Sequence, residues 1–350
     1  MRRVSRIAAA GVATAALAVS ATACGGTSSD AAGSGDGKSK GVAIAYDVGG
    51  KGDQSFNDAA TAGMDKASKD LKIGKKAVEP TDGESDADKA QRLTELAKQG
   101  YNPVIGIGYA YAPAVKEVAA KFPKVNFGIV DDATIEADNV SDLVFNEEQS
   151  SYLAGVAAAK ATKTKTVGFI GGVNNPLIRK FEAGFVQGVK ATDKSVKIKR
   201  QFLTEKAEDG GFSSPDKGKE GANGQIEGGA DVVYHAAGLS GQGVIEAAAA
   251  KKVWAIGVDS DQYEQKALAK YKKYILTSAT KDVAGAVYNL TKSVQDDKAK
   301  GGVVRADLKS GGVALADSNP EYKKMKDLQA AVAKAEQDIT SGKTKVKTTL

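Results

Sequence analysis

Short runs of β-branched and apolar residues recur along the chain, and amphipathic segments separate them. The runs occupy 42–46, 104–107, 126–130, 166–170, 231–234 and 253–258. Near-continuous apolar strands of this kind are typical of parallel sheets that are covered on both faces. Between the first two runs, apolar residues return at helical spacing, at Phe56, Ala60, Met64, Ala67 and Leu71. The alternation predicts an α/β fold in which helices cover doubly wound parallel sheets.

The same organisation occurs twice. A strand, a glycine-containing loop and a helix are expected at 42–71 and again at 167–189. A chain of 350 residues is long enough for two domains of ordinary size. We therefore predict two similar lobes with a ligand in the cleft between them. Because ligands of open α/β sheets bind beyond the carboxyl ends of the strands, the loops that follow each strand are the candidate site.

The first 24 residues resemble the export signal of a bacterial lipoprotein. Arg2, Arg3 and Arg6 precede an uncharged stretch at 7–19, and small residues lead to Cys24. The apolar stretch is shorter than the ~20 residues that span a bilayer. We predict a signal peptide at 1–23, lipid attachment at Cys24 and a flexible Gly/Ser/Ala/Asp/Lys tether at 24–40. An ordinary signal peptide followed by an unmodified thiol is the alternative.

Charge and composition exclude several function classes. Removal of the three arginines with the signal lowers the formal net charge from +6 to +3, so the mature chain does not have the strongly basic character of a nucleic-acid-binding protein. One cysteine and one histidine leave no disulfide, no usual zinc cluster and no Cys/His nucleophile. No metal or cofactor is expected. His235 lies in an apolar strand, where a core histidine is the more common finding.

Polar residues follow most of the predicted strands. The first strand runs into a loop at 47–57 that contains Asp47, Phe56 and Asn57, without a nucleotide-binding glycine pattern. Asp131 follows the strand at 126–130. The strands at 231–234, 253–258 and 274–276 lead to Gly238, Asp259 and Lys281, respectively. Carboxylates at strand ends can accept hydrogen bonds from the hydroxyls of a polar ligand. They could equally be helix caps or the acid and base of a glycosidase, and Phe56 could be a core residue.

Seven stretches in order along the chain resemble the basic membrane protein family of bacterial lipoproteins. That family comprises purine nucleoside receptors of ABC importers, and the likeness covers about residues 41–320. The stretches are AYDVGG at 45–50, SFN at 55–57, FNEEQSSYLAG at 145–155, VGFIGG at 167–172, FEAGF at 181–185, GADVV at 229–233 and IGVDSDQ at 256–262.

The resemblance implies a two-lobed sugar-receptor fold in which the chain crosses three times between lobes. It would place one lobe at 41–145 plus 257–282 and the other at 146–256 plus 283–350. It also implies roles for individual residues. Phe56 and Phe212 would stack on the base, whereas Phe181 would serve in packing. Asp47 and Asn57 would bind the base edge, and Asp259, the Gly238 backbone and Lys281 would hold the ribose, with Asp131 as an addition.

The function that follows is that of a non-enzymatic receptor. The resemblance implies a monomer, anchored by lipid on the extracytoplasmic face of the cell membrane, that binds a purine nucleoside (adenosine, guanosine or inosine) and delivers it to an ABC transporter permease. No nucleic acid, metal or cofactor would take part. Two alternatives stay open: a receptor of the same fold for a sugar or another small polar ligand, and an extracytoplasmic hydrolase that uses Asp47 and Asp259.

Overall fold

The computed structural model describes residues 39–81 and 83–350. The predicted signal peptide, Cys24 and nearly all of the predicted tether therefore lie outside the described residues. Residues 39–350 form one compact unit, and its buried hydrophobic residues run from Val42 to Ile339. This part of the chain contains a complete core of its own. No helix in it is long and apolar enough to cross a membrane.

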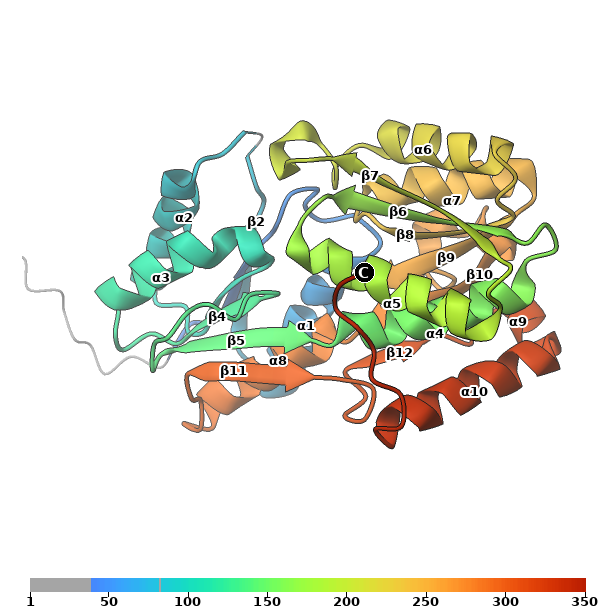
Figure 1. Cartoon of the computed structure of the whole chain (residues 1–350). Helices are drawn as coiled ribbons and strands as arrows, with labels where there is room; N and C mark the ends of the chain where they lie inside the picture. Colours follow the sequence, from blue (N-terminus) through green and yellow to red (C-terminus); the bar gives the residue numbers. More distant parts are fainter. Residues whose placement is uncertain (1–38, 82) are drawn as a thin grey trace, which may run out of the picture. The chain divides into compact units, whose positions relative to one another are not determined.

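Two six-stranded sheets organise these residues (Figure 1). The first has the order β11-β5-β4-β3-β1-β2, and every neighbouring pair in it is parallel. Its strands are β1 (Gly41–Ala45), β2 (Gly74–Val78), β3 (Val104–Gly106), β4 (Phe127–Val130), β5 (Val140–Phe145) and β11 (Gly302–Ala306). The inner strands β1, β3, β4 and β5 are buried throughout, as expected for strands covered on both faces.

The second sheet has the order β12-β10-β9-β8-β6-β7. Its strands are β6 (Thr166–Val173), β7 (Lys197–Thr204), β8 (Val232–Ala236), β9 (Trp254–Asp259), β10 (Ile275–Lys281) and β12 (Val313–Leu315). Five of them run parallel, and the edge strand β12 pairs antiparallel with β10. The predicted α/β class with doubly wound, mostly parallel sheets is confirmed.

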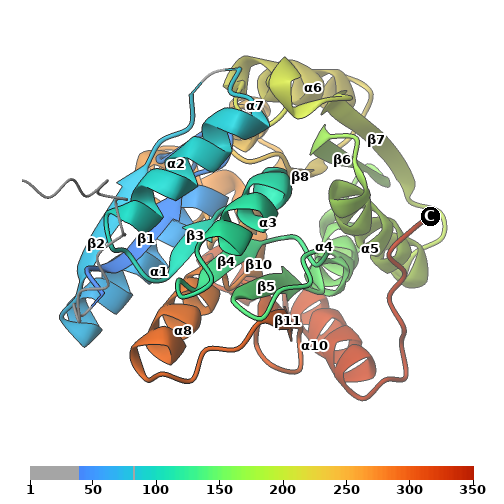
Figure 2. The same ribbon diagram turned by 90° about the vertical axis from the view of Figure 1, so that its left-hand side faces the viewer.

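Helices cover both faces of each sheet (Figure 2). On the first sheet, α1 (Phe56–Leu71) and α8 (Val283–Gln295) pack together on one face, and α2 (Asp86–Lys98) and α3 (Ala112–Lys121) pack together on the other. The second sheet has α4 (Glu147–Ala161) and α5 (Pro176–Thr192) on one face and α6 (Pro215–Glu227) and α7 (Ser240–Lys251) on the other. The chain ends with α9 (Pro320–Lys324) and α10 (Lys326–Thr340), and α10 packs on α4. The 3₁₀ turns are Tyr109–Tyr111, Ala207–Asp209, Lys266–Leu268 and Lys272–Tyr274.

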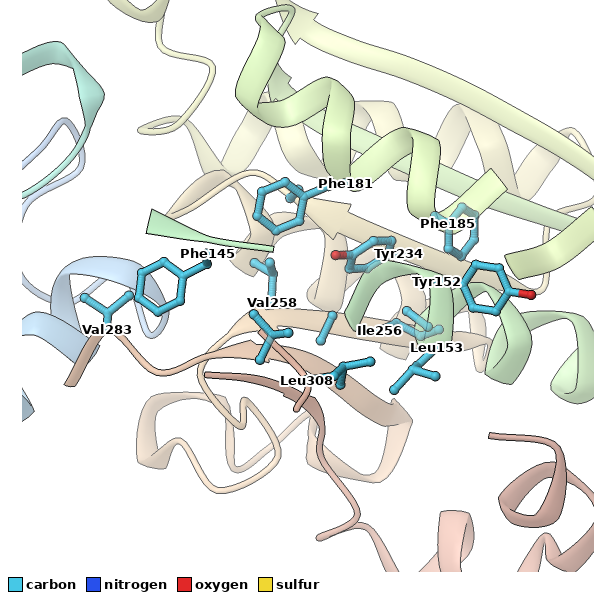
Figure 3. Packing of buried hydrophobic residues seen from close by; sticks show 14 of the residues in the cluster. Phe145, Tyr152, Leu153, Phe181, Phe185, Tyr234, Ile256, Val258, Val283 and Leu308 are labelled. Carbon is cyan, nitrogen blue, oxygen red and sulfur yellow. The ribbon is translucent and has the colours of Figure 1, made fainter. Parts of the chain in front are cut away.

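Aromatic rings and close helix contacts hold the second lobe together. The rings of Phe185 on α5 and Tyr234 on β8 lie 5.3 Å apart between centroids (Figure 3). The ring centroid of Phe169 lies 6.1 Å from that of Phe185. A Cβ on Gly188 would come within 2.0 Å of the Tyr152 carbonyl oxygen. Glycine there lets α5 approach α4 closely.

The lobe boundaries differ from those that we predicted. Segment 257–282 was expected in the first lobe, but β9 and β10 pair within the second sheet. Segment 283–350 was expected wholly in the second lobe, but α8 packs on α1 and β11 pairs with β5 of the first sheet. The first lobe therefore comprises 41–145 and 283–306, and the second comprises 146–281 and 313–340. The chain does cross three times, after β5, after β10 and between β11 and β12 (Figure 1).

Candidate ligand-binding site

A cleft between the two lobes gathers the residues predicted from the strand-end loops and the family resemblance. It encloses an open space of about 520 Å³, its mouth included. All eight predicted residues line it: Asp47, Phe56, Asn57 and Asp131 from the first lobe, and Phe212, Gly238, Asp259 and Lys281 from the second. The cleft lies at the carboxyl ends of the strands, where open α/β sheets bind their ligands. The structure therefore brings the predicted residues together.

Lys281, the last residue of β10, forms a buried ion pair that joins the two lobes. Its Nζ lies 2.7 Å from Asp131 Oδ2 of the first lobe and 3.6 Å from Asp259 Oδ1 of the second. Burial opposes the charge of Lys281, but Asp131, Asp259 and Glu147 outweigh that effect and raise the pKa of its ammonium group above the ordinary value. Lys281 is therefore a permanent cation, and no other residue lining the cleft carries a positive charge.

Three aromatic rings surround the Lys281 ammonium group. Its Nζ lies 4.6 Å from the ring centroid of Phe56, 5.5 Å from that of Phe145 and 5.6 Å from that of Phe181. Ring faces at these distances attract a cation. Phe181, which we assigned to packing, is buried and also lines the cleft. The rings restrict where the ammonium group can lie.

Two carboxylates beside Lys281 retain buried oxygen atoms that no described residue donates to. Asp131 Oδ1 and Asp259 Oδ1 are both of this kind, whereas Asp259 Oδ2 accepts a 2.7 Å hydrogen bond from Ser55 Oγ. An unsatisfied buried acceptor costs about 1–3 kcal/mol, so each of these oxygens is suited to a donor from a ligand. Both residues have positive φ, 69° for Asp131 and 62° for Asp259, a conformation that aspartate tolerates better than most residues. The chain therefore turns sharply at both strand ends.

Asn57 serves mainly to orient Asp47. Its Oδ1 accepts from the Asp47 backbone N at 3.1 Å, and its Nδ2 donates to Asp53 Oδ2 at 3.2 Å. Asp53 also accepts from the backbone N of Ser55, Asn57 and Asp58, so its side chain caps the start of α1. One Nδ2 hydrogen of Asn57 is left for a ligand.

Of the two carboxylate oxygens of Asp47, only Oδ1 accepts a hydrogen bond from a described residue. The donor is the Val48 backbone N, at 2.8 Å, and Oδ2 accepts no hydrogen bond within the described chain. Burial raises the pKa of the Asp47 carboxyl to about 7, and the nearby charge of Asp131 acts in the same direction. Near neutral pH, this carboxyl can therefore act either as a donor or as an acceptor.

The position of Phe212 depends on two glycines. Phe212 lies in the loop before α6 and lines the cleft. A Cβ on Gly172 would come within 2.4 Å of its Cδ1 atom, and a Cβ on Gly238 would lie 3.3 Å from its carbonyl oxygen. Gly238 also has φ of 52°, which favours glycine. Gly238 therefore shapes the cleft by allowing Phe212 to approach.

Hydrogen bonds between the lobes close the rim of the cleft. Asn175 Nδ2 donates to Tyr109 OH at 3.0 Å, and Gln242 Nε2 donates to the Gly52 carbonyl at 2.9 Å. Ser260 Oγ donates to the Ser55 carbonyl at 2.8 Å. Tyr109 was missed by our sequence analysis, although it follows the strand at 104–107, and the strand-end rule could have found it.

The remaining sequence candidates lie elsewhere. His235 is fully buried, with its Nε2 atom 3.0 Å from Gln262 Oε1, and is a core residue as expected. Within residues 39–81 and 83–350, no group of three His, Cys, Asp or Glu side chains is arranged to hold a metal ion.

The two similar lobes, their three crossovers and the polar, ring-lined cleft define the class of two-lobed substrate-binding proteins. Residues 40–348 match the family model described as ABC transporter substrate-binding protein PnrA-like, or Bmp. The chain belongs to this family, as its resemblance to the basic membrane proteins predicted.

Individual relatives agree with this assignment. The "ABC transporter nucleoside-binding protein BmpA" of Lactococcus lactis is 38% identical over 86% of this chain and 87% of the relative. A protein named an uncharacterized lipoprotein from Pyrococcus horikoshii is 34% identical over 80% of this chain and 70% of the relative. Among solved structures, an ABC transporter solute-binding protein from Aeropyrum pernix superposes with a TM-score of 0.76 at 28% identity, over 88% of this chain and 93% of that one.

Proposed function

We propose that this protein is a lipid-anchored, extracytoplasmic receptor that binds a purine nucleoside in the cleft and delivers it to an ABC importer. The observation that carries the proposal is the composition of the cleft. Aromatic rings, two carboxylates with unsatisfied oxygens and one buried cation line the same space between two lobes. A nucleoside offers a flat base for the rings and hydroxyl donors for the carboxylates.

The rings account for affinity toward a base. Phe56 from the first lobe and Phe212 from the second both line the cleft. Stacking on an aromatic side chain contributes about 1–3 kcal/mol per base and tolerates different bases. A ring from each lobe means that one base would contact both lobes, which favours the closed arrangement.

The charges account for the choice of a neutral ligand with hydroxyl groups. Asp131 Oδ1 and Asp259 Oδ1 are buried acceptors, suited to the hydroxyls of a ribose. A phosphate group would meet these carboxylates with only Lys281 to compensate, so nucleosides fit better than nucleotides. We expect the protein not to hydrolyse the nucleoside. Lys281 is held in an ion pair, and no described residue next to Asp47 is arranged as an activated nucleophile.

Anchorage and delivery rest on the family and on the predicted export signal. Members of the family are substrate-binding proteins of ABC transporters, and the Pyrococcus relative carries the name lipoprotein. Cys24 would carry the lipid and keep the receptor beside its permease. A Cys24→Ser chain should appear in the culture medium or the soluble fraction; retention in the membrane fraction would refute the anchor.

The experiment that tests the ligand is titration calorimetry with adenosine, guanosine, inosine, cytidine, ribose and a free purine. The chain should first be unfolded and refolded to remove any bound ligand. We expect one-to-one binding of purine nucleosides, weaker or no binding of ribose or base alone, and unchanged nucleoside afterwards by chromatography. Tight binding of ribose alone would favour the sugar receptor, and a free base among the products would favour the hydrolase.

A matched pair of variants assigns the binding to this cleft. Asp131→Asn removes the charge that contacts Lys281 and should weaken nucleoside binding by about 10–100-fold. Asp138→Asn makes the same change at an exposed position outside the cleft and should have no effect. Equal affinities in the two variants would show that the nucleoside binds elsewhere.

A further inference from the structure

The tether enters the folded part at the end of the first sheet that lies opposite the cleft. Ser39 Oγ donates to the Asn102 carbonyl at 2.9 Å, and the Lys40 backbone N donates to the Gly100 carbonyl at 2.9 Å. Both contacts lie at the start of β1, whereas the cleft lies at the carboxyl ends of the strands. The 15 residues from Cys24 to Ser39 reach at most about 50 Å even when fully extended. A lipid on Cys24 would therefore hold this end of the first lobe near the bilayer.

Loops at this end are joined into one surface, which we call the basal face. It consists of residues 39–41, 71–74, 98–103, 122–126, 137–140 and 296–301. Asn126 N donates to Asn102 Oδ1 at 2.9 Å, Asn139 Nδ2 to the Val125 carbonyl at 2.9 Å, and Ser141 Oγ to the Lys300 carbonyl at 3.0 Å. These bonds connect the loops from β1 across to β11, so the charges on them act together.

Lysines dominate the basal face. Six of its lysines are exposed and form no salt bridge with any described residue: Lys40, Lys72, Lys98, Lys124, Lys298 and Lys300. The exposed carboxylates in the same loops are fewer. Asp296 is paired with Lys292 at 2.6 Å, which leaves Asp138 and Asp297, with Glu136 beside the face. The basal face therefore carries an excess of positive charge, opposite in sign to the cleft.

We propose that the basal face binds the anionic lipid headgroups of the membrane to which the protein is tethered. Each lysine near an anionic surface strengthens binding by roughly fivefold, and the attraction decays within about 8 Å at physiological salt. The tether keeps the protein beside the bilayer and allows the face to come within that range. The first lobe then lies against the bilayer through its basal face, on the side of that lobe opposite the cleft. The proposal holds for any ligand of the cleft and takes from the proposed function only the membrane anchor.

Vesicle sedimentation with residues 39–350 tests lipid binding without the anchor. This part of the chain contains its own core and can be produced alone. We expect it to bind vesicles that contain phosphatidylglycerol in about 0.02 M salt and to be released in about 0.5 M salt. Vesicles of phosphatidylcholine alone should not bind it.

Two matched quartets of substitutions locate the interaction. Changing Lys40, Lys98, Lys124 and Lys300 to Gln should weaken binding to the anionic vesicles by at least about tenfold. The control changes Lys160, Lys163, Lys194 and Lys197 to Gln, four exposed lysines without salt bridges on the second lobe, and should leave binding unchanged. Equal losses in both quartets, equal binding to the neutral lipid, or no binding by the unchanged chain would each overturn the proposal. An unfolding temperature equal to that of the wild-type protein would show that each quadruple variant is folded.

Discussion

The two lobes share one architecture but bring different chemistry to the cleft. The first lobe supplies Asp47 and Asp131, both carboxylates, and the ring of Phe56. The second supplies Lys281, the only cation among the lining residues. Because Asp131 lies 2.7 Å from Lys281, the closed arrangement neutralises part of the first lobe with a charge from the second. The second lobe also supplies the Asp259 carboxylate, 3.6 Å from Lys281, so this one cation faces a carboxylate from each lobe.

The largest effect is expected from removing the cation of the second lobe. Lys281→Met would leave Asp131 and Asp259 buried without a counter-charge, which should lower the free energy of unfolding by about 3–5 kcal/mol and abolish measurable nucleoside binding. Urea unfolding and calorimetry measure the two effects. Lys292→Met, at an exposed ion pair on α8, is the control and should change stability by at most about 1 kcal/mol.

A double variant distinguishes loss of the ion pair from general damage at position 281. Adding Asp131→Asn to Lys281→Met removes one of the two unpaired charges and should restore part of the lost stability. Binding should stay absent because the Lys281 contact is still missing. A double variant less stable than Lys281→Met would show that the two lobes are not coupled through this pair.

A smaller, pH-dependent effect is expected from Asp47 of the first lobe. Burial raises the pKa of its carboxyl from 3.8 to about 7, so the folded state binds more protons than the unfolded state between these values. Its contribution to stability therefore decreases as the pH rises from about 4 to 7. With a purine nucleoside bound as we propose, the ionised carboxyl would accept from the N1–H of guanosine or inosine, whereas the protonated carboxyl would donate to N1 of adenosine.

Affinity ratios measure this switch directly. Between pH 6 and 8, the ratio of guanosine to adenosine affinity should rise several-fold, by about tenfold at most, as Asp47 loses its proton. Burial also raises the pKa of Glu147 to about 7 and that of Asp53 to about 6, and both carboxyls are present in every variant. Asp47→Asn should therefore flatten the ratio while the pH dependence of stability from the other two remains. A ratio that still varies in Asp47→Asn would assign the switch to another group.

The sequence predicted most of the inner strands and the strand-end site because both leave local signals. The inner strand β5 was missed because Ser141 and Asp142 interrupt its apolar residues. Fully apolar runs such as 42–46 correspond to buried strands, and ligand-facing residues follow them. The edge strands β7 and β11 were missed because lysine and arginine interrupt their apolar residues, as in Lys197–Thr204. The lobe boundary was wrong for a different reason. Which sheet β11 joins depends on its pairing with β5, more than 150 residues earlier, and no local pattern encodes that choice.

It was harder to predict what each residue does in the site than to predict which residues line it. Phe212 was placed by family resemblance alone, because its loop follows no apolar strand run that we identified, and its position depends on Gly172 and Gly238. Asn57 was assigned to the base edge, yet most of its hydrogen-bonding groups hold Asp47 and Asp53. Residue type and spacing cannot show how a side chain divides its hydrogen bonds among neighbours, because that division is set by three-dimensional packing.

The smallest effect is expected at the rim, where the lobes meet through a neutral hydrogen bond. Tyr109→Phe removes the hydroxyl that accepts from Asn175 Nδ2 but keeps the ring in the cleft. One neutral bond contributes about 0.5–1.5 kcal/mol, so nucleoside affinity should fall by roughly 2–10-fold, mainly through faster dissociation. Tyr101→Phe makes the same change outside the cleft and should leave the dissociation rate unchanged in stopped-flow measurements. This bond joins the lobes without charge. If Tyr109→Phe lowered nucleoside affinity as much as Asp131→Asn does, closure would depend on the rim as much as on the buried ion pair.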